Sequence, residues 1–291
     1  MFGSFVYKAN AKLNLCLDII GIRPDGYHLI ESIMQSVGIC DIVSVKKNKK
    51  SEIRVFCKGM DIPEEKNIAY KAAKLFFETA NITNKGVIIK IKKNIPAQAG
   101  MGGGSADAAA VLIALNEIFK TNYSTEELCN IGEKVGADVP FCIKGGTQFV
   151  RGIGEILTKL EDCPPCYFVV VKGNEGVSTK EAYEDFDRAE NLPPLRIEKV
   201  IELLATGDFS ALQNKLINVF EKSTRLSCIS KTIQRLKECG AIEAAMTGSG
   251  SAVFGIFRTK SEAKKCLKAV KNEFPFAAVT KPVVFGVEKS F

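Results

Sequence analysis

A glycine-rich segment carries the clearest chemical signal in this sequence. Residues 96–105 read Pro-Ala-Gln-Ala-Gly-Met-Gly-Gly-Gly-Ser, and they join a strand-like segment at 86–93 to an apolar helix predicted over 108–119. Glycine lets the backbone approach a ligand closely, and the first N–H groups of a helix lack internal partners and carry the positive end of the helix dipole. We therefore predict a phosphate-binding loop, with Ser105 as the N-cap of the following helix.

The spacing of the glycines excludes two common phosphate loops. A P-loop requires Gly-Lys-Ser/Thr, and no lysine follows these glycines. A dinucleotide-binding fingerprint requires a glycine three residues after Gly102, and Ser105 stands there instead. A tight turn without a ligand is the plainer alternative, and the run of glycines beside a capping serine argues against it.

Two further segments contain residues suited to acid–base chemistry. Asp138 lies in residues 136–141, Gly-Ala-Asp-Val-Pro-Phe, between the end of a predicted helix and a proline that restricts the local backbone. Lys12 and Asn14 alternate with leucines in a predicted strand, so they share one face of it. An active-site pair is one interpretation. A turn or cap aspartate and an ordinary exposed strand edge are the alternatives that these residues leave open.

The segment Asp-Gly-Tyr-His at 25–28 holds the only histidine of the chain. The first two residues predict a turn that presents Tyr27 and His28 together. An aromatic ring and an imidazole can hold a flat base by stacking and by edge hydrogen bonds. A lone histidine with a structural role is the alternative.

Together these motifs resemble those of the GHMP small-molecule kinases, the family that includes homoserine, mevalonate and galactose kinases. Segment 11–15 (Ala-Lys-Leu-Asn-Leu), the glycine-rich segment, and segment 245–255 with its Thr-Gly-Ser-Gly-Ser turn occur in the expected order. The resemblance implies an α+β fold of two domains. An N-terminal nucleotide-binding domain would span residues 1–156, a C-terminal ferredoxin-like, acceptor-binding domain would span residues 157–291, and the active site would lie in the cleft between them.

Segments 25–28 and 136–141 are typical of only one branch of this superfamily. They resemble the branch that phosphorylates the 2-hydroxyl of 4-diphosphocytidyl-2-C-methyl-D-erythritol in non-mevalonate isoprenoid precursor biosynthesis. This resemblance implies ATP as co-substrate, Mg²⁺, a cytidine-diphosphate-linked polyol as acceptor, and no nucleic-acid partner. Two alternatives stay open: another GHMP kinase, for homoserine or mevalonate, and a non-catalytic nucleotide or RNA binder on the same scaffold.

The resemblance also implies roles for individual residues. Asp138 would take the proton from the acceptor hydroxyl, and Lys12 would keep that aspartate ionised. The implied ATP-binding residues are Pro96, Ala97, Gln98, Ala99, Gly100, Met101, Gly102, Gly103, Gly104 and Ser105. The implied acceptor-binding residues are Asn14, Tyr27, His28, Thr179, Tyr183, Thr247, Gly248 and Ser249. Two positions depart from the common pattern: Asn10 replaces a proline and Ala106 replaces a second serine. Apart from Asp138, these motifs contain no evident magnesium ligand.

Composition agrees with a globular enzyme. The net charge is +7, and the dense basic run at 46–50 lies between strand-like segments, where a solvated hairpin loop accounts for it. The ten cysteines are scattered through mostly apolar segments and predict reduced core thiols. The close pair Cys163 and Cys166 precedes a strand, unlike a redox motif, and a zinc site would need two more ligands. No membrane-length apolar run or signal-peptide pattern occurs, which predicts a cytoplasmic protein. The motifs indicate no oligomeric state.

The remaining elements predict how these residues are positioned. Helices are expected after two N-caps, Asn67 for residues 68–80 and Ser124, with a capping box, for residues 125–135. Further helices are expected at 198–205, 209–220, 230–239 and 261–274. Further strands are expected at 167–171, 241–246, 252–257 and 278–284. This irregular mixture of strands and helices favours α+β layering.

Overall fold

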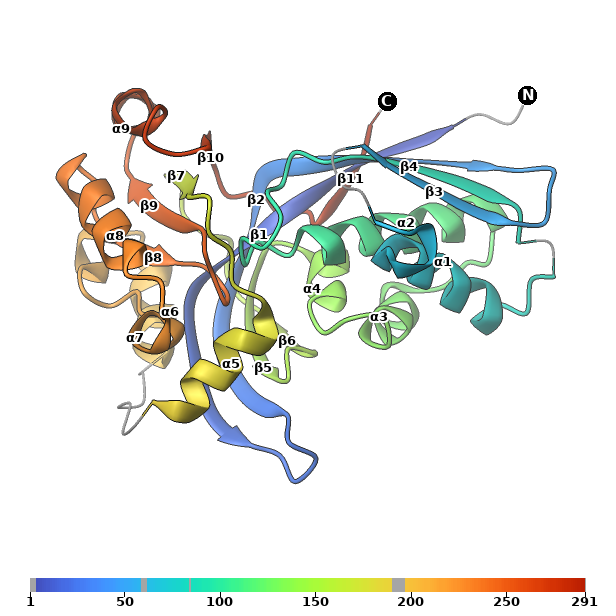
Figure 1. Cartoon of the computed structure of the whole chain (residues 1–291), viewed down its shortest axis with the longest axis horizontal. Coiled ribbons are helices and arrows are strands. Elements are labelled where there is room, and N and C mark those ends of the chain that lie inside the picture. The colour runs from blue at the N-terminus through green and yellow to red at the C-terminus, as the bar shows by residue number, and fades with distance from the viewer. Residues whose placement is uncertain (1–3, 59–61, 84, 190–196, 291) are drawn as a thin grey trace.

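The computed structural model describes residues 4–58, 62–83, 85–189 and 197–290, and its strands form two sheets (Figure 1). The seven-stranded sheet contains β1 (Phe5–Ile22), β2 (His28–Lys47), β3 (Ile53–Lys58), β4 (Val87–Lys92), β5 (Thr147–Gly152), β6 (Ile156–Lys159) and β11 (Val287–Ser290). The four-stranded sheet contains β7 (Tyr167–Lys172), β8 (Ala244–Met246), β9 (Val253–Phe257) and β10 (Phe276–Thr280).

Four helices gather on one side of the large sheet, where Figure 1 shows them beneath strands β3 and β4. They are α1 (Ile68–Thr79), α2 (Gly103–Phe119), α3 (Thr125–Glu133) and α4 (Val139–Lys144). The side chains of α2 are buried almost continuously from Ala106 to Leu115. A helix that is apolar on all sides belongs in the interior, and α2 packs against α1, α4, β1 and β2.

The long hairpin of β1 and β2 connects the two halves of the molecule. Its register runs from Phe5 opposite Val45 to Ile22 opposite His28, with irregularities after Asn10, Asn14 and Ile19. Its first part contributes leucines to the core beneath the large sheet. Further along, Leu17 and Ile30 pack in a second core with the small sheet. Figure 1 shows the hairpin tip extending beyond both sheets, next to helix α5 (Thr179–Arg188).

The small sheet has the ferredoxin-like arrangement that the sequence predicts. Its strand order is β10-β7-β9-β8, with α8 (Cys228–Glu238) between β7 and β8 and α9 (Lys260–Val270) between β9 and β10. This is the βαββαβ unit with the strands in the order 4-1-3-2. Between β7 and α8 the chain carries an insertion. It contains α5, α6 (Ile197–Ala205), a 3₁₀ turn at Phe209–Leu212 and α7 (Phe220–Ser223).

The domain division at residues 156 and 157 remains a prediction. Strand β6 begins at that point and pairs with β5 in the large sheet. The last strand, β11, also returns to the large sheet and pairs with β1.

Two predicted N-caps are confirmed and one is wrong. The Asn67 side chain accepts from the Ala69 N–H at 2.9 Å, and Ser124 forms the complete capping box with Glu127. Ser105, by contrast, lies inside α2. The helix begins at Gly103, and its N-cap is Gly102 with a left-handed φ of 68°. Because glycine tolerates that conformation, the chain turns into the helix earlier than a serine cap would allow.

The predicted helix at 209–220 is also wrong. Only its first residues form a 3₁₀ turn, and Asn214 has a left-handed φ of 58°. The chain then runs beside β1, where the Leu17 N–H donates to the Ile217 carbonyl at 3.0 Å and the Val219 N–H donates to the Leu17 carbonyl at 2.9 Å. These long-range backbone bonds replace the helical ones.

The other predicted elements mostly exist with shifted ends. Helix α6 matches closely, α8 starts two residues early, and α9 ends at Val270. Strand β8 covers only the end of 241–246, and β10 ends at Thr280 because the chain then crosses to β2, where the Val283 N–H donates to the Ser36 carbonyl. The sequence analysis missed helix α5, which begins with a capping box of Ser178 and Glu181.

The ten cysteines are free thiols, as predicted. Within the described residues, no helix combines the length and the apolar character needed to span a bilayer.

Candidate active site

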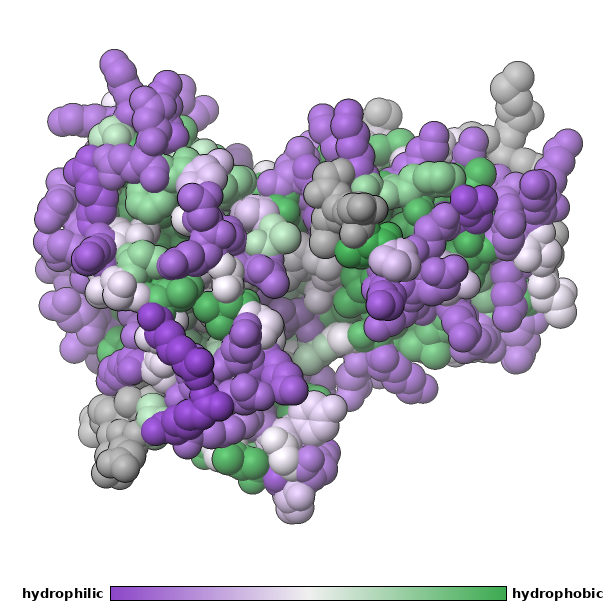
Figure 2. Space-filling model, in the orientation of Figure 1, coloured by the Kyte–Doolittle hydropathy of each residue, from purple (hydrophilic) through white to green (hydrophobic). Residues whose placement is uncertain are grey.

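A cavity of about 930 Å³ lies where the hairpin, the glycine-rich loop, α5 and the turn after β8 meet. Figure 2 shows the surface indented between the two halves of the molecule. Almost every residue that the sequence singled out lines this cavity: Lys12, Asn14, Tyr27, His28, the loop from Pro96 to Ser105, Asp138, Thr179, Tyr183, Gly248 and Ser249. Thr247 does not line it. That side chain is buried, and its hydroxyl accepts from the Asn14 N–H at 2.8 Å.

The glycine-rich loop is shaped by its contacts with two other elements. Gly100 has a φ of 70°, and a Cβ there would lie 2.0 Å from the Thr247 carbonyl oxygen. A Cβ on Gly102 would lie 3.0 Å from Cγ of Lys12. The loop therefore packs against the turn after β8 on one side and against β1 on the other. Its end presents the first N–H groups of α2 to the cavity, as an anion site requires.

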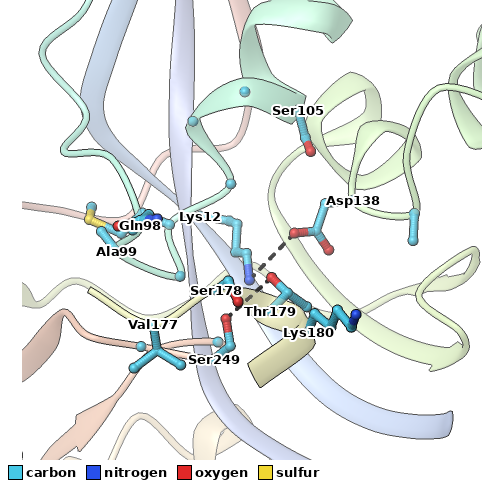
Figure 3. A pocket seen from close by; sticks show the side chains of 18 of the residues that line it. Lys12, Gln98, Ala99, Ser105, Asp138, Val177, Ser178, Thr179, Lys180 and Ser249 are labelled. Carbon is cyan, nitrogen blue, oxygen red and sulfur yellow. Dashed lines mark hydrogen bonds and ion pairs between the residues drawn. The ribbon is translucent and has the colours of Figure 1, made fainter. Parts of the chain in front are cut away.

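Lys12 and Asp138 face each other beside this loop (Figure 3). Lys12 is 4% exposed, and its Nζ lies 3.6 Å from Oδ2 of Asp138. The Lys12 ammonium also donates to Oδ1 of Asn14. Asp138 is the residue before α4, but its side chain makes no capping hydrogen bond. Asp138 therefore lies in a turn without capping α4 through its side chain, and the buried Lys12 does not lie on an exposed strand edge.

Asn14 is held by three neighbours. Besides accepting from Lys12, it donates from Nδ2 to the Ser32 hydroxyl at 2.7 Å, and its backbone N–H donates to Thr247. Asn14 is buried, with 1% of its surface exposed. Its orientation beside the lysine is therefore set by the hairpin and by the turn after β8.

The turn at 247–251 is supported from below by two side chains. Nδ2 of Asn218 donates to the carbonyls of Met246 and Gly248, at 2.9 and 2.7 Å. The Glu221 carboxylate accepts from the Met246 N–H at 2.7 Å. On the cavity side, the Ser249 and Thr179 hydroxyls lie 3.4 Å apart (Figure 3). The turn thereby joins the small sheet to the start of α5.

The hairpin tip and α5 form an aromatic wall of the cavity. Tyr27 is 60% exposed. The His28 ring stacks on Tyr183, with 4.6 Å between centroids and 26° between planes. Burial, together with the charge of Asp138, raises the pKa of Tyr183 to about 12, so its hydroxyl stays protonated at neutral pH.

A charged cluster closes the opposite end of the cavity. The Lys93 ammonium donates to Asp41 and, at 2.6 Å, to Asp107. Asp41 also accepts from the N–H groups of Asn94 and Ile95. Burial raises the pKa of Asp107 to about 7, while Lys93 opposes that shift. This cluster holds the segment after β4 against the start of α2, where the glycine-rich loop ends.

Comparison with known proteins settles the family. Family models of the GHMP kinases match at residues 67–146, for the N-terminal domain, and at 200–275, for the C-terminal domain. The chain belongs to the GHMP kinase family. It is 43% identical over 279 residues to the 4-diphosphocytidyl-2-C-methyl-D-erythritol kinase of Clostridium botulinum (strain Alaska E43 / Type E3), covering 95% of this chain and 99% of the relative. The enzyme of the same name from Clostridium beijerinckii is 42% identical over the same shares.

Solved structures agree with this assignment. A crystal structure of 4-(cytidine 5'-diphospho)-2C-methyl-D-erythritol kinase aligns with a TM-score of 0.80 at 31% identity, covering 95% of this chain and 98% of that one. A homoserine kinase from Cytophaga hutchinsonii aligns with a TM-score of 0.76 at 19% identity, covering 99% and 97%, which shows the shared fold alone. Membership of this kinase family implies ATP as co-substrate and a small-molecule acceptor.

This GHMP kinase brings the glycine-rich loop and the Lys12–Asp138 pair to one cavity. Sequence reasoning missed Asp41 and Asp107, because each lies within a strand or helix and belongs to no short motif. It also missed Asp187 beside His28, because the two residues are far apart in the chain.

Replacing Gly100 by alanine tests the contact between loop and turn. The new Cβ would collide with the Thr247 carbonyl, so the loop must move away from the turn after β8. We expect kcat/KM for ATP to fall by about 10²-fold, the scale of a 1 Å misplacement. Gly240→Ala is the matched control, because Gly240 also has positive φ but has nothing within 4 Å of its Cβ position. Equal kinetics of the two variants would contradict the proposed packing.

Glu221 predicts a pH dependence of stability. Burial raises the pKa of Glu221 from 4.5 to about 7; the Met246 N–H opposes this shift and Glu243 adds to it. Between these pH values the folded chain binds a proton that the unfolded chain has released. The free energy of unfolding should therefore fall by at most about 3 kcal/mol as pH rises from 4.5 to 7.

Glu221→Gln should flatten this dependence, because the amide oxygen can still accept from Met246 and does not titrate. Urea unfolding of both proteins at pH 5 and pH 7.5 measures the difference. Parallel pH profiles of the two proteins would show that Glu221 does not titrate as described.

Proposed function

We propose that this chain phosphorylates the 2-hydroxyl of 4-diphosphocytidyl-2-C-methyl-D-erythritol with ATP, giving the 2-phosphate and ADP for the non-mevalonate route to isoprenoid precursors. The Lys12–Asp138 pair carries the proposal, since it lies between the glycine-rich loop and the aromatic wall at the hairpin tip. The names of relatives at 41–43% identity over nearly the full length support it. We also propose that the protein acts in the cytoplasm, as expected from the sequence.

The glycine-rich loop supplies the seat for the triphosphate. Backbone N–H groups from Gly102 to Ser105 point to the cavity and bind the β- and γ-phosphates without a side-chain charge. The adenosine then extends toward Lys93, Ile95 and Asn67, which line the opposite end. Phosphoryl transfer depends mainly on positioning and on neutralising charge, so a rigid loop suits it.

Asp138 accepts the proton of the attacking hydroxyl. Its side chain is 31% exposed and lines the cavity, so an acceptor can reach it. Lys12 is fixed by Asn14 and places its ammonium group 3.6 Å from the Asp138 carboxylate. Lys12 also stabilises negative charge on the reacting oxygen.

The residues of this site fit a Mg²⁺ ion that is bound in the way kinases bind it. Within the described residues, no group of three or more His, Cys, Asp or Glu side chains is arranged to hold a metal. Mg²⁺ in kinases binds mainly to phosphates and water, with one or two carboxylates. The Asp138 and Asp107 carboxylates and the Ser105 hydroxyl line the cavity and are oxygen atoms that would hold the ion beside the loop. Bound Mg²⁺ neutralises charge on the transferred phosphoryl group.

The aromatic wall favours an acceptor that carries a base. Tyr27, His28 and Tyr183 lie on the acceptor side of the Lys12–Asp138 pair. Homoserine and mevalonate have no ring to stack on these side chains. The mevalonate kinase structures that align with this chain, at 13–17% identity, show the fold alone.

An acceptor panel tests the proposal. The purified chain with ATP and Mg²⁺ is offered 4-diphosphocytidyl-2-C-methyl-D-erythritol, homoserine, mevalonate and galactose, and ADP release is measured. We expect turnover with the cytidine compound alone. Asp138→Asn should lower kcat by about 10²–10⁴-fold, since that is the worth of a positioned base. The unfolding midpoint in urea should change little, because asparagine keeps an oxygen atom beside Lys12 and the side chain caps no helix.

Turnover with homoserine or mevalonate in place of the cytidine compound would contradict the proposed substrate. ATP binding with no turnover on any acceptor would point to a binding protein. RNA affinity that falls steeply with salt and is unchanged by Lys12 or Asp138 substitution would support a nucleic-acid role.

A further inference from the structure

The hairpin tip is joined to α5 by one polar contact. Nε2 of His28 lies 2.6 Å from Oδ1 of Asp187, and both residues line the cavity. The His28 side chain is 11% exposed, whereas that of Asp187 is 47% exposed. The two residues lie 159 positions apart, so this contact connects the first hairpin of the chain to the insertion after β7.

Aromatic rings enclose the remaining sides of His28. Tyr183 stacks on one face, and Phe186 meets the ring edge at 6.0 Å and 86°. Phe220 packs edge-on against both Tyr183 and Phe186, at 5.1 and 6.4 Å. The imidazole is therefore a fixed part of the wall, and its orientation depends on what holds its nitrogens.

Asp187 determines that orientation. An ionised carboxylate can only accept hydrogen bonds, and Nε2 of His28 is the ring nitrogen that meets the carboxylate, while Nδ1 is left as the other ring nitrogen. A ring turned over about its Cβ–Cγ bond would lose this bond. Asp187 thus selects one rotamer and one hydrogen-bonding pattern of the imidazole.

Helix α5 is connected to the rest of the protein by its own contacts. Its N-terminus is closed by the capping box of Ser178 and Glu181. Further along, Asp185 is 9% exposed and pairs with Arg188 at 3.1 Å and with Arg225 in the segment after α7. Because the helix is tied to the body of the protein, Asp187 can hold the hairpin tip in place.

We propose that Asp187 is a positioning residue for the acceptor pocket. Through His28 it fixes the hairpin tip, including the exposed Tyr27, against α5, so that the acceptor meets a preformed wall. This inference rests on the proposed function, because its consequence concerns the cytidine-bearing acceptor. Without this contact the tip is free to move. Acceptor binding must then also order the tip, which weakens the binding free energy.

Kinetics of three single variants test the inference. Asp187→Ala should raise KM for the acceptor about 10-fold, the effect expected for loss of a charge-assisted hydrogen bond. kcat and KM for ATP should stay within about 2-fold, because the glycine-rich loop and the Lys12–Asp138 pair are untouched. Asp187→Asn keeps an oxygen acceptor and should recover most of the lost affinity. Glu202→Ala is the control, since it removes an exposed ion pair with Lys199 on α6, away from the cavity.

A double variant separates positioning from direct contact. If Asp187 acts through His28, adding Asp187→Ala to His28→Ala should have no further effect on the acceptor KM. An undiminished effect in that background would mean that Asp187 touches the acceptor itself, and would overturn the inference. So would an unchanged acceptor KM in Asp187→Ala, or equal losses for acceptor and ATP. Failure of the unaltered chain to use the acceptor would instead refute the proposed function, and this inference with it.

Discussion

The structure depends on a buried lysine. Lys12 lies in the middle of β1, and a buried ammonium is stable only if oxygen atoms surround it. Those oxygens come from Asn14 on the same strand and from Asp138 before α4. The stem of the lysine packs beneath Gly102, where an added Cβ would lie 3.0 Å from Cγ of Lys12. Strand, loop and helix must therefore keep one relative position, on which the proposed phosphoryl transfer also depends.

The hairpin converts this local constraint into a two-part molecule. Alternate residues of β1 and β2 fill the core of the large sheet, and residues nearer the tip fill the core of the small sheet. The cavity lies where the hairpin passes from one core to the other. The glycine-rich loop contributes the anion seat from one side, and the turn after β8 and α5 close the other. Because the turn also contacts Asn14, a shift of the small sheet would move Asn14 and with it the contact to Lys12.

Much of the site could be predicted because its residues belong to short local motifs. Glycine spacing and an Asp close to a proline are read from neighbouring residues, and both the glycine-rich loop and Asp138 line the cavity. Features that depend on distant contacts could not be read in this way. The segment at 209–220 has helical periodicity, yet its backbone bonds to β1. Asp41, Asp107 and Asp187 gain their importance from partners elsewhere in the chain. Ser105 failed as an N-cap because a glycine with positive φ starts the helix first.

The most direct test of this account is the rate of phosphoryl transfer in Lys12→Met at saturating ATP and acceptor, measured in a single turnover. Methionine keeps the length of the stem and removes the charge. The account predicts a fall of about 10²–10⁴-fold in that rate, with ATP affinity within a few-fold of the unaltered chain, because the loop N–H groups remain. A near-normal rate would contradict the central role of the Lys12–Asp138 pair. So would a loss confined to ATP binding.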